Sequence, residues 1–410
     1  MRGFKSRRRL QLLFDNRLER GLVRLGRRGT SALSKRHGEK TQTLVYLSLW
    51  EAVIKVISMN MNSIIVSELA APAIWDGTRT VGESALDRFN SIKRLRLTNL
   101  RTPIERADRL RRLIPGAPHL FIKRDDLTGY FAGGNKLRKL EYTMADALAK
   151  GATTVITTGS VTSNLARTAA LVARRLGLKC VLVLNGGDPK KARANARVAE
   201  LLGVEVHAVD TREDRDRRMN EIAGMLSERG EHVYKIPLGA SNEIGSFGMV
   251  AAMEEFRIQQ LQLGEQFDAI VFATSSGGTQ AGLEAGKRLF GYRNLRILGI
   301  SADDPAESIK QSVRGALDPM LSSLGFSGFP GHAEQEELSV DDSFVGPGYG
   351  VASPESDEAS RLFADAEGIL LDPVYTSKAA AGLIAYCRER MFRESDRVLF
   401  WHTGGLMTLI

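Results

Sequence analysis

The chain has 410 residues, of which 43% are hydrophobic and 26% are charged. This composition is typical of a globular protein with a large core, and it excludes collagen-like, low-complexity and disulfide-framework proteins. The net charge of +9 is concentrated near the N-terminus: residues 1–40 hold 13 Lys/Arg and 3 Asp/Glu, whereas the other 370 residues hold 44 basic and 45 acidic groups. A nearly neutral body gives no reason to expect nucleic-acid binding.

Residues 1–75 are expected to form a basic N-terminal extension, disordered or partly helical. For residues 1–40, an unused upstream start, a disordered arm, a transit-like peptide and a nucleic-acid arm are open alternatives, and the density of like charge favours the first two. Residues 41–58 are a candidate docking helix. No run of 18 apolar residues occurs anywhere, so no membrane span or membrane partner is expected.

The cysteines and histidines give little sign of bridges or metal ligands. Cys180 and Cys387 both lie in apolar surroundings, which favours free thiols in a reducing, cytoplasmic compartment. The six histidines show no metal-ligand spacing, so no metal centre is expected.

From residue 119 onward, short apolar runs alternate with segments of helical periodicity. This alternation predicts βαβ units and mostly parallel sheets covered by helices on both faces, hence an α/β fold. The expected strands begin within 119–129 and lie at 153–160, 178–184, 204–209, 232–237, 267–274 and 295–302. The expected helices lie at 135–151, 165–177, 192–203, 217–230, 245–261 and 275–291.

A glycine-rich loop, ATSSGGTQAGLEAG, follows the strand 267–274 and begins a helix. Such a loop presents backbone N–H groups to an anion at the positive end of the helix dipole. It matches neither the dinucleotide-binding fingerprint nor the P-loop, so it indicates a phosphate-bearing cofactor rather than a nucleotide. A tight turn that needs glycine is the alternative. The expected phosphate contacts are Ser276, Gly277, Gly278 and Thr279.

Two further segments carry candidate chemistry. In GGNKLRKLE, Lys136 begins an amphipathic helix, and Lys139 lies on nearly the same helical face. The functional interpretation is an imine-forming lysine, against the alternative of two solvated lysines. In TTGSVTSNLART, Ser163 and Asn164 precede a helix whose N–H groups suit a carboxylate, although an ordinary N-cap explains them equally.

Seven motifs occur in one order: KRDDLTG, GGNKLRKLE, TSN-x-AR, SGGTQAGL, GPGYG, LDPVYTSKA and HTGG. Together they resemble the fold type II pyridoxal-phosphate enzymes, and within these the D-cysteine desulfhydrase and 1-aminocyclopropane-1-carboxylate deaminase family, over about residues 90–405. The resemblance implies two open, mostly parallel-sheet α/β domains with pyridoxal 5'-phosphate between them. Residues 90–138 and 256–410 would form the large cofactor domain, and 139–255 the small inserted one. It also implies a homodimer.

The resemblance further implies a role for individual residues. Lys136 would hold the cofactor as a Schiff base and move the Cα proton. Ser163 would hold the substrate carboxylate, and Tyr349 and Tyr375 would line the substrate pocket. The cofactor contacts would be Lys136, Lys139, Asn164, Ser276, Gly277, Gly278, Thr279, Thr376 and Thr403.

Thr376 and Thr403 favour the desulfhydrase within the resembled family. Neutral groups beside the ring nitrogen suit loss of a good leaving group such as thiolate, whereas opening a cyclopropane asks for an acidic partner. The expected reaction is elimination from D-cysteine to pyruvate, sulfide and ammonia. Alternatives are aminocyclopropane carboxylate, cysteate or D-serine as substrate, and a cofactor-binding homologue without turnover. Leu165, Met249 and Ser275 depart from the family pattern and leave the substrate open.

Overall fold

The computed structural model describes residues 79–98, 101–129, 132–187, 195–326 and 337–409. All of them belong to one compact unit, Gly77–Ile410. The expectations for residues 1–75, including the helix at 41–58, lie outside the described residues. Within the described ranges, no helix combines the length and apolarity needed to cross a bilayer.

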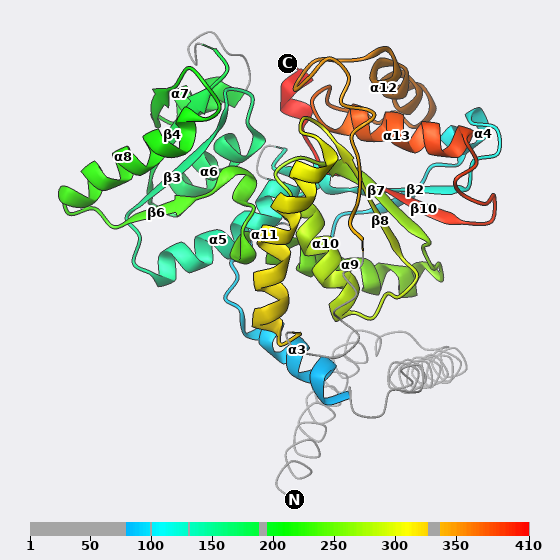
Figure 1. The fold of residues 1–410 in the computed structure, drawn as a ribbon, viewed down its shortest axis with the longest axis horizontal. Coiled ribbons are helices and arrows are strands. Elements are labelled where there is room, and N and C mark those ends of the chain that lie inside the picture. The colour runs from blue at the N-terminus through cyan, green and yellow to red at the C-terminus, as the bar shows by residue number, and fades with distance from the viewer. Residues whose placement is uncertain (1–78, 99–100, 130–131, 188–194, 327–336, 410) are drawn as a thin grey trace, which may run out of the picture. The chain divides into compact units, whose positions relative to one another are not determined.

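One sheet has four parallel strands in the order β5-β4-β3-β6. The strands are β3 (Thr154–Ser160), β4 (Lys179–Asn185), β5 (Glu205–Ala208) and β6 (Val233–Ile236). The helices that connect and flank them are α5 (Gly134–Ala149), α6 (Asn164–Arg175), α7 (Asn195–Leu201) and α8 (Asp214–Glu228). Figure 1 shows this sheet in green with its helices.

Alternating side chains bury both faces of this sheet. Val155 and Leu182 pack with α5 and α6 in one apolar cluster, whereas the next residues, Ile156 and Val183, pack with Ile222 of α8 in another. The two-residue period of a strand sends consecutive side chains to opposite faces, so apolar residues at consecutive positions require helices on both sides.

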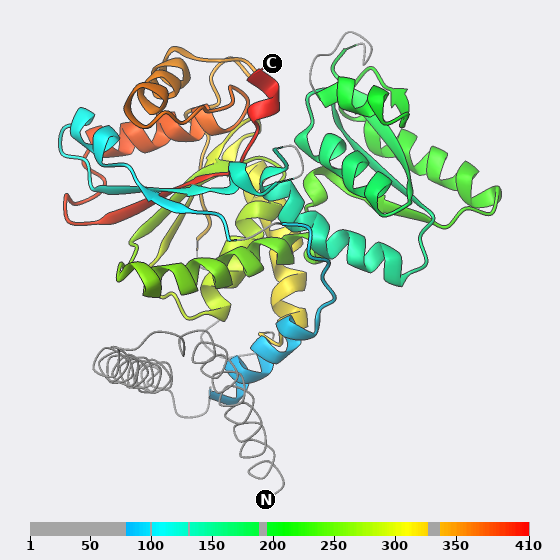
Figure 2. The ribbon, with the colours of Figure 1, turned by 180° about the vertical axis from the view of Figure 1, so that it is seen from behind.

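The other sheet has six strands in the order β1-β2-β10-β7-β8-β9, of which only β1 is antiparallel to its neighbour. The strands are β1 (Ile104–Arg106), β2 (His119–Arg124), β7 (Ala269–Thr274), β8 (Arg296–Ser301), β9 (Ser339–Asp341) and β10 (Arg397–His402). Figure 2 shows this sheet from the reverse side, with β10 beside β2.

Helices cover both faces of this sheet as well. Val271 and Phe400 pack with α4 (Asp108–Leu113), α12 (Pro354–Glu367) and α13 (Thr376–Arg388). The next residue on each strand, Phe272 or Trp401, points to the opposite face. There it packs with α9 (Glu243–Leu263) and α10 (Gly278–Leu289). Among the described residues the remaining helices are α3 (Arg79–Ser91) and α11 (Ala306–Leu324), with short 3-10 turns at Asp125–Leu127, Leu238–Ala240 and Leu406–Leu409.

Every strand and helix expected between residues 119 and 302 forms, and the parallel pairing confirms the α/β class. The last helix begins at Gly278, three residues later than expected, because Ser275, Ser276 and Gly277 form the loop. Strand β10, from the end of the chain, lies between β2 and β7, a neighbour relation that local periodicity does not contain. The division into domains at 138/139 and 255/256 stays a prediction.

Candidate active site

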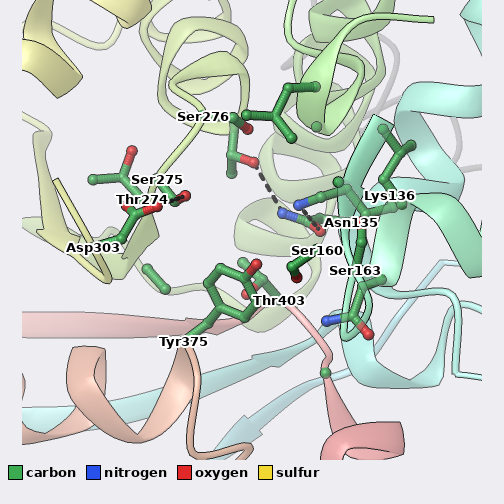
Figure 3. Close-up of a pocket in the computed structure, with 18 of the residues that line it drawn as sticks. Asn135, Lys136, Ser160, Ser163, Thr274, Ser275, Ser276, Asp303, Tyr375 and Thr403 are labelled. Carbon is green, nitrogen blue, oxygen red and sulfur yellow. Dashed lines mark hydrogen bonds between the residues drawn. The ribbon is translucent and has the colours of Figure 1, made fainter. Parts of the chain in front are cut away.

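A cavity lies where the carboxyl ends of strands from both sheets meet. Its lining includes residues that follow β3, β7, β8 and β10 and the first turn of α5. In parallel α/β proteins the carboxyl ends of the strands are where ligands bind, because loops and helix N-termini converge there. Figure 3 shows the cavity, with Lys136 and Ser163 facing Ser275, Asp303 and Tyr375 across it.

Nine of the residues predicted from the sequence line this one cavity. They are Lys136, Ser163, Asn164, Ser276, Gly277, Thr279, Tyr349, Tyr375 and Thr403. Three other predicted residues are buried and lie next to lining residues in the sequence, but they do not line the cavity themselves. They are Lys139, Gly278 and Thr376.

Glycine brings the start of α5 against the loop after β10. Gly134 has a φ of +59°, and a Cβ at this position would overlap the carbonyl oxygen of Thr403. The backbone N–H of Asn135 donates to that same carbonyl oxygen over 2.9 Å. Because only glycine tolerates both the positive φ and the close approach, the GGNK segment fixes Lys136 beside Thr403.

Lys136 is held by its neighbour in the sequence. Its Nζ donates to Asn135 Oδ1 over 3.1 Å, while the amide Nδ2 of Asn135 donates to Thr279 Oγ1 over 2.9 Å. Burial lowers the pKa of Lys136 to about 8, and the negative charge of Asp372 partly opposes that effect. An amine with this pKa is partly neutral near physiological pH, as a nucleophile and proton acceptor requires.

The loop before α10 forms a cradle of small residues and hydroxyls. Gly277 has a φ of +79°, and a Cβ there would lie 2.7 Å from the backbone of Ser312 and Val313. A Cβ on Gly278 would lie 2.6 Å from Ser241 Oγ, whose hydroxyl is hydrogen-bonded to Ser276 over 2.8 Å. This space is closed to side chains, and the loop leads into the N-terminus of α10.

Lys139 lies behind this cradle as a fully buried amine. Its Nζ donates to Gly239 O over 3.1 Å and to Ser241 Oγ over 3.2 Å, and no carboxylate among the described residues pairs with it. Burial, and then the charge of Lys136, holds the pKa of Lys139 well below its usual value. A phosphate group on the far side of the serine pair fits this donor set and supplies the missing negative charge.

A second polar atom also fits a bound ligand. Thr274 lines the cavity, and its Oγ1 is buried without a hydrogen-bond partner among the described residues. Buried hydroxyls are normally paired, so an unpaired one in a cavity wall points to a partner that a ligand provides.

The sequence left two interpretations of the β3–α6 loop: an ordinary helix N-cap, or a helix start that binds a carboxylate. The structure is compatible with both. Ser163 is the N-cap of α6, and its Oγ accepts a hydrogen bond from the backbone N–H of Ala166 over 3.2 Å. Ser163 and Asn164 nevertheless line the cavity, so the N-terminus of α6 faces the cavity, where it suits an anionic group. Leu165 also lines it, which makes this part of the wall apolar.

Two tyrosines from distant segments meet at the opposite wall. The hydroxyls of Tyr349 and Tyr375 are 2.5 Å apart, and Tyr349 also contacts Ser160 Oγ at 3.3 Å. Burial, followed by the interaction with Tyr349, raises the pKa of Tyr375 well above 10. Tyr375 is therefore a proton-bearing hydroxyl at all physiological pH values.

The two threonines singled out in the sequence lie in different environments. Thr403 lines the cavity. Thr376 is fully buried, and its hydroxyl donates to Asp372 Oδ1 over 2.7 Å and accepts from the backbone N–H of Asp372. Asp372 also accepts from the backbone N–H groups of Val374 and Tyr375, so Thr376 helps to shape the turn that carries Tyr375.

Several lining residues were missed by sequence reasoning. Asn135 adjoins Lys136 in the GGNK motif, and Asp303 follows the carboxyl end of β8, so motif context and strand ends could have indicated both. Ser160, Asn185, Arg212 and Arg215 also line the cavity, and no local signal distinguishes the two arginines from other charges of their region.

This site belongs to the class of pyridoxal-phosphate enzymes. Its features are two open α/β sheets, a half-buried lysine with a lowered pKa and a glycine loop that suits a phosphate. The match to known proteins agrees with this geometry: residues 95–404 match the family described as pyridoxal-phosphate dependent enzyme. The chain belongs to this family, and its cofactor is pyridoxal 5'-phosphate.

Individual relatives narrow the comparison. The chain is 42% identical to a Thermotoga maritima protein provisionally named 1-aminocyclopropane-1-carboxylate deaminase, over 71% of this chain and 90% of that protein. It is 36% identical to the D-cysteine desulfhydrase of Yersinia enterocolitica, over 77% of this chain and 94% of that protein. A crystal structure of an ACC deaminase homologue, 34% identical, has a TM-score of 0.72 and covers 80% of this chain and 96% of its own, which confirms the fold type II architecture.

Proposed function

We propose that this enzyme catalyses α,β-elimination on a small amino acid, with D-cysteine as substrate and pyruvate, sulfide and ammonia as products. The observation that carries the proposal is the neutral Thr403 in the cavity wall with Lys136, together with the family likeness to D-cysteine desulfhydrases. A neutral group near the reacting end suits a reaction whose leaving group departs readily as an anion.

Lys136 is the proposed base. A pKa of about 8 leaves a usable fraction of its amine neutral near pH 7.5, so its Nζ can accept the Cα proton. The hydrogen bond to Asn135 Oδ1 restricts where Nζ can lie. When bound, the cofactor supplies the electron sink that makes this proton removable.

The remaining lining residues bind and orient the reactants. In the proposal the phosphate is held by Ser276, Gly277 and Thr279, which line the cavity, and by Lys139 and Gly278, which lie just outside the lining. Ser163, Asn164 and the N-terminus of α6 orient the carboxylate end and the ring. Tyr375, kept protonated and hydrogen-bonded to Tyr349, holds a proton where the leaving group departs.

Deamination of 1-aminocyclopropane-1-carboxylate is the second candidate. It is favoured by the 42% identity to the Thermotoga maritima protein and by the ACC deaminase homologue structure. Thr376 weighs against it, because its hydroxyl is committed to Asp372 and provides no acid to the cavity. Three further candidates are cysteate as the substrate, D-serine as the substrate, and a protein that binds the cofactor without turnover.

The homodimer, the cytoplasmic location and the division into a large domain (90–138 and 256–410) and a small one (139–255) also belong to the proposal. Two α/β sheets with separate apolar clusters support the division. Light scattering of the purified protein tests the dimer directly.

The deciding experiment supplies the full chain with pyridoxal phosphate and assays pyruvate and sulfide together. D-cysteine, L-cysteine and 1-aminocyclopropane-1-carboxylate are offered in parallel, with Lys136→Ala as the control. We expect equal amounts of pyruvate and sulfide from D-cysteine and no products from the variant. A 2-oxo acid from the cyclopropane substrate alone would establish the deaminase instead. Cofactor absorbance without any turnover would leave only a binding protein.

A further inference from the structure

Arg215 is a buried cation in the cavity wall that lacks a carboxylate partner among the described residues. It lies in the first turn of α8 and is 9% exposed. Its Nε donates to Arg212 O over 2.9 Å and its Nη1 to Asn185 Oδ1 over 3.4 Å, and both acceptors are neutral. A guanidinium keeps its charge at every physiological pH. The charges of Asp216 and Glu213 act on Arg215 from nearby, but neither residue forms an ion pair with it and the charge of Arg212 opposes theirs, so its burial keeps an electrostatic cost that an anion in contact would offset.

The neighbouring charges are already paired with one another. Arg212 donates to both carboxylate oxygens of Asp304, over 2.8 and 2.5 Å, and lies 3.7 Å from Asp303. Asp303 in turn accepts from Ser275 Oγ and from the backbone N–H of Asp304. Burial, and then the charge of Asp304, raises the pKa of Asp303, which weakens it further as a counter-ion. Asp303 is the only carboxylate residue that lines the described cavity.

In the proposed function, the anionic groups of the cofactor and of the substrate lie at different parts of this cavity. The cofactor phosphate faces the Ser276–Thr279 cradle, and the substrate carboxylate faces the N-terminus of α6 in the proposed function. Arg215 belongs to neither set: it lines the same cavity as Asn185 and Tyr349. Tyr349 is also the tyrosine that contacts Tyr375, where the leaving group is expected.

We propose that Arg215 is a specificity-determining residue that selects substrates whose β-substituent carries negative charge. The inference rests on the proposed function and names its substrate class: a thiolate or a sulfonate on Cβ is preferred over a neutral hydroxyl. For a sulfonate, Lys136 takes the Cα proton, the electron pair of that bond forms the Cα=Cβ bond, and the Cβ–S bond breaks so that sulfur leaves with its bonding pair as sulfite. The released aminoacrylate takes up a proton at Cβ, and water hydrolyses it to pyruvate and ammonia. No oxidant or reductant enters this balance.

The test uses the full-length holoenzyme with cysteate in both enantiomers, D-cysteine and D-serine. Arg215→Gln removes the charge, Arg215→Lys keeps it, and Arg218→Gln removes an exposed charge from the same helix. Two quantities are measured: kcat/KM, and the dissociation constant from the change in the cofactor's visible absorbance on titration. For each variant, kcat/KM for cysteate is divided by kcat/KM for D-serine, and the two dissociation constants are compared in the same way. These ratios cancel any general loss of activity.

We expect Arg215→Gln to lower the cysteate-to-serine ratio by about 10- to 100-fold, as for the loss of a charged hydrogen bond. Arg215→Lys should recover part of that loss, and Arg218→Gln should leave the ratio unchanged. Unchanged ratios in Arg215→Gln, with D-cysteine still converted, would overturn the inference and leave the proposed function standing. Arg215-dependent cysteate binding without turnover of D-cysteine would support the inference and defeat the proposed substrate.

Discussion

The side-chain amide of Asn135 joins Thr279 to Lys136: it donates to Thr279 Oγ1 over 2.9 Å and accepts from Lys136 Nζ over 3.1 Å. One residue thus connects the phosphate cradle at the start of α10 with the reactive amine at the start of α5. Fixing the amine relative to the phosphate loop fixes it relative to a cofactor held there, which is the positioning that efficient proton transfer needs.

Asn135→Ala should therefore impair catalysis more than folding. Loss of one positioning hydrogen bond is expected to lower kcat on the order of tenfold. Steady-state kinetics and thermal unfolding of the holoenzyme check this, with Thr279→Ser as the variant that keeps the hydroxyl. Equal kcat values for wild type and Asn135→Ala would show that Asn135 does not position Lys136.

The lowered pKa of Lys136 predicts how cofactor attachment depends on pH. Only the neutral amine is nucleophilic, and because burial lowers its pKa to about 8, the neutral fraction rises through pH 8 rather than through 10.5. Stopped-flow absorbance after mixing apoenzyme with pyridoxal phosphate should show a rate that increases from pH 6.5 to 9 and then levels off. A rate that still climbs tenfold per pH unit at pH 9.5 would contradict a depressed pKa.

Gly134→Ala should disturb the contact between α5 and the loop after β10. The new Cβ would overlap Thr403 O and lie 3.2 Å from the Cα of Gly404, so Lys136 and Thr403 must move apart. Gly151→Ala is the matched control, since Gly151 also has a positive φ (+71°) but no atom lies within 4 Å of its added Cβ.

In this comparison both variants carry the cost of the left-handed conformation, about 1 kcal/mol. Gly134→Ala should in addition weaken cofactor binding at least tenfold, measured by absorbance titration. Similar cofactor affinity in the two variants would show that the close approach at Gly134 is not needed.

A buried ionic network beside the site should carry much of the acid sensitivity of the fold. Asp125 accepts from Arg138 and from Trp401 Nε1, and Arg138 also pairs with Glu255. Despite the burial that opposes it, Arg138 holds the pKa of Asp125 below its usual value. Its stabilisation is therefore complete above the unfolded-state pKa near 4 and is lost as pH falls through the lower folded value.

Asp125→Asn should lower the free energy of unfolding by about 3–5 kcal/mol at pH 7, because it leaves Arg138 without one of its two carboxylates. The decline in stability below pH 4 should also become shallower than in wild type. Urea unfolding at pH 7 and pH 3.5 measures both effects. Asp108→Asn, which removes an exposed pair with Arg106, should cost at most about 1 kcal/mol.

Tyr375→Phe should lower kcat about 100-fold if Tyr375 supplies the proton at the leaving group. Because its pKa lies well above 10, no decline in the wild-type rate below pH 9.5 should arise from Tyr375. Comparing pH–rate profiles of wild type, Tyr375→Phe and Tyr349→Phe separates a proton donor from a packing residue. An unchanged kcat in Tyr375→Phe would remove this residue from the mechanism.

Local sequence patterns predicted a large part of this protein. Strands and helices between residues 119 and 302 follow from apolar periodicity, because burial on two faces imposes its period on each segment. Lys136 and the loop at Ser276–Thr279 could also be identified from local sequence. In both segments the glycines that allow a close backbone approach are adjacent in the chain to the groups that donate hydrogen bonds. Seven ordered motifs then supplied the family.

The tertiary structure alone decided which distant residues face one another. The placement of β10 between β2 and β7 brings Thr403 to Lys136. The loop before α8 and the first turn of α8 bring Arg212 and Arg215 to a cavity built largely by other segments. It also separated Thr376, turned to Asp372, from Thr403 in the cavity. The periodicity of a segment shows which of its faces is buried but not which partner buries it. The identity of the cavity wall therefore depends on pairings between segments far apart in the chain, such as Arg397 of β10 with His119 of β2.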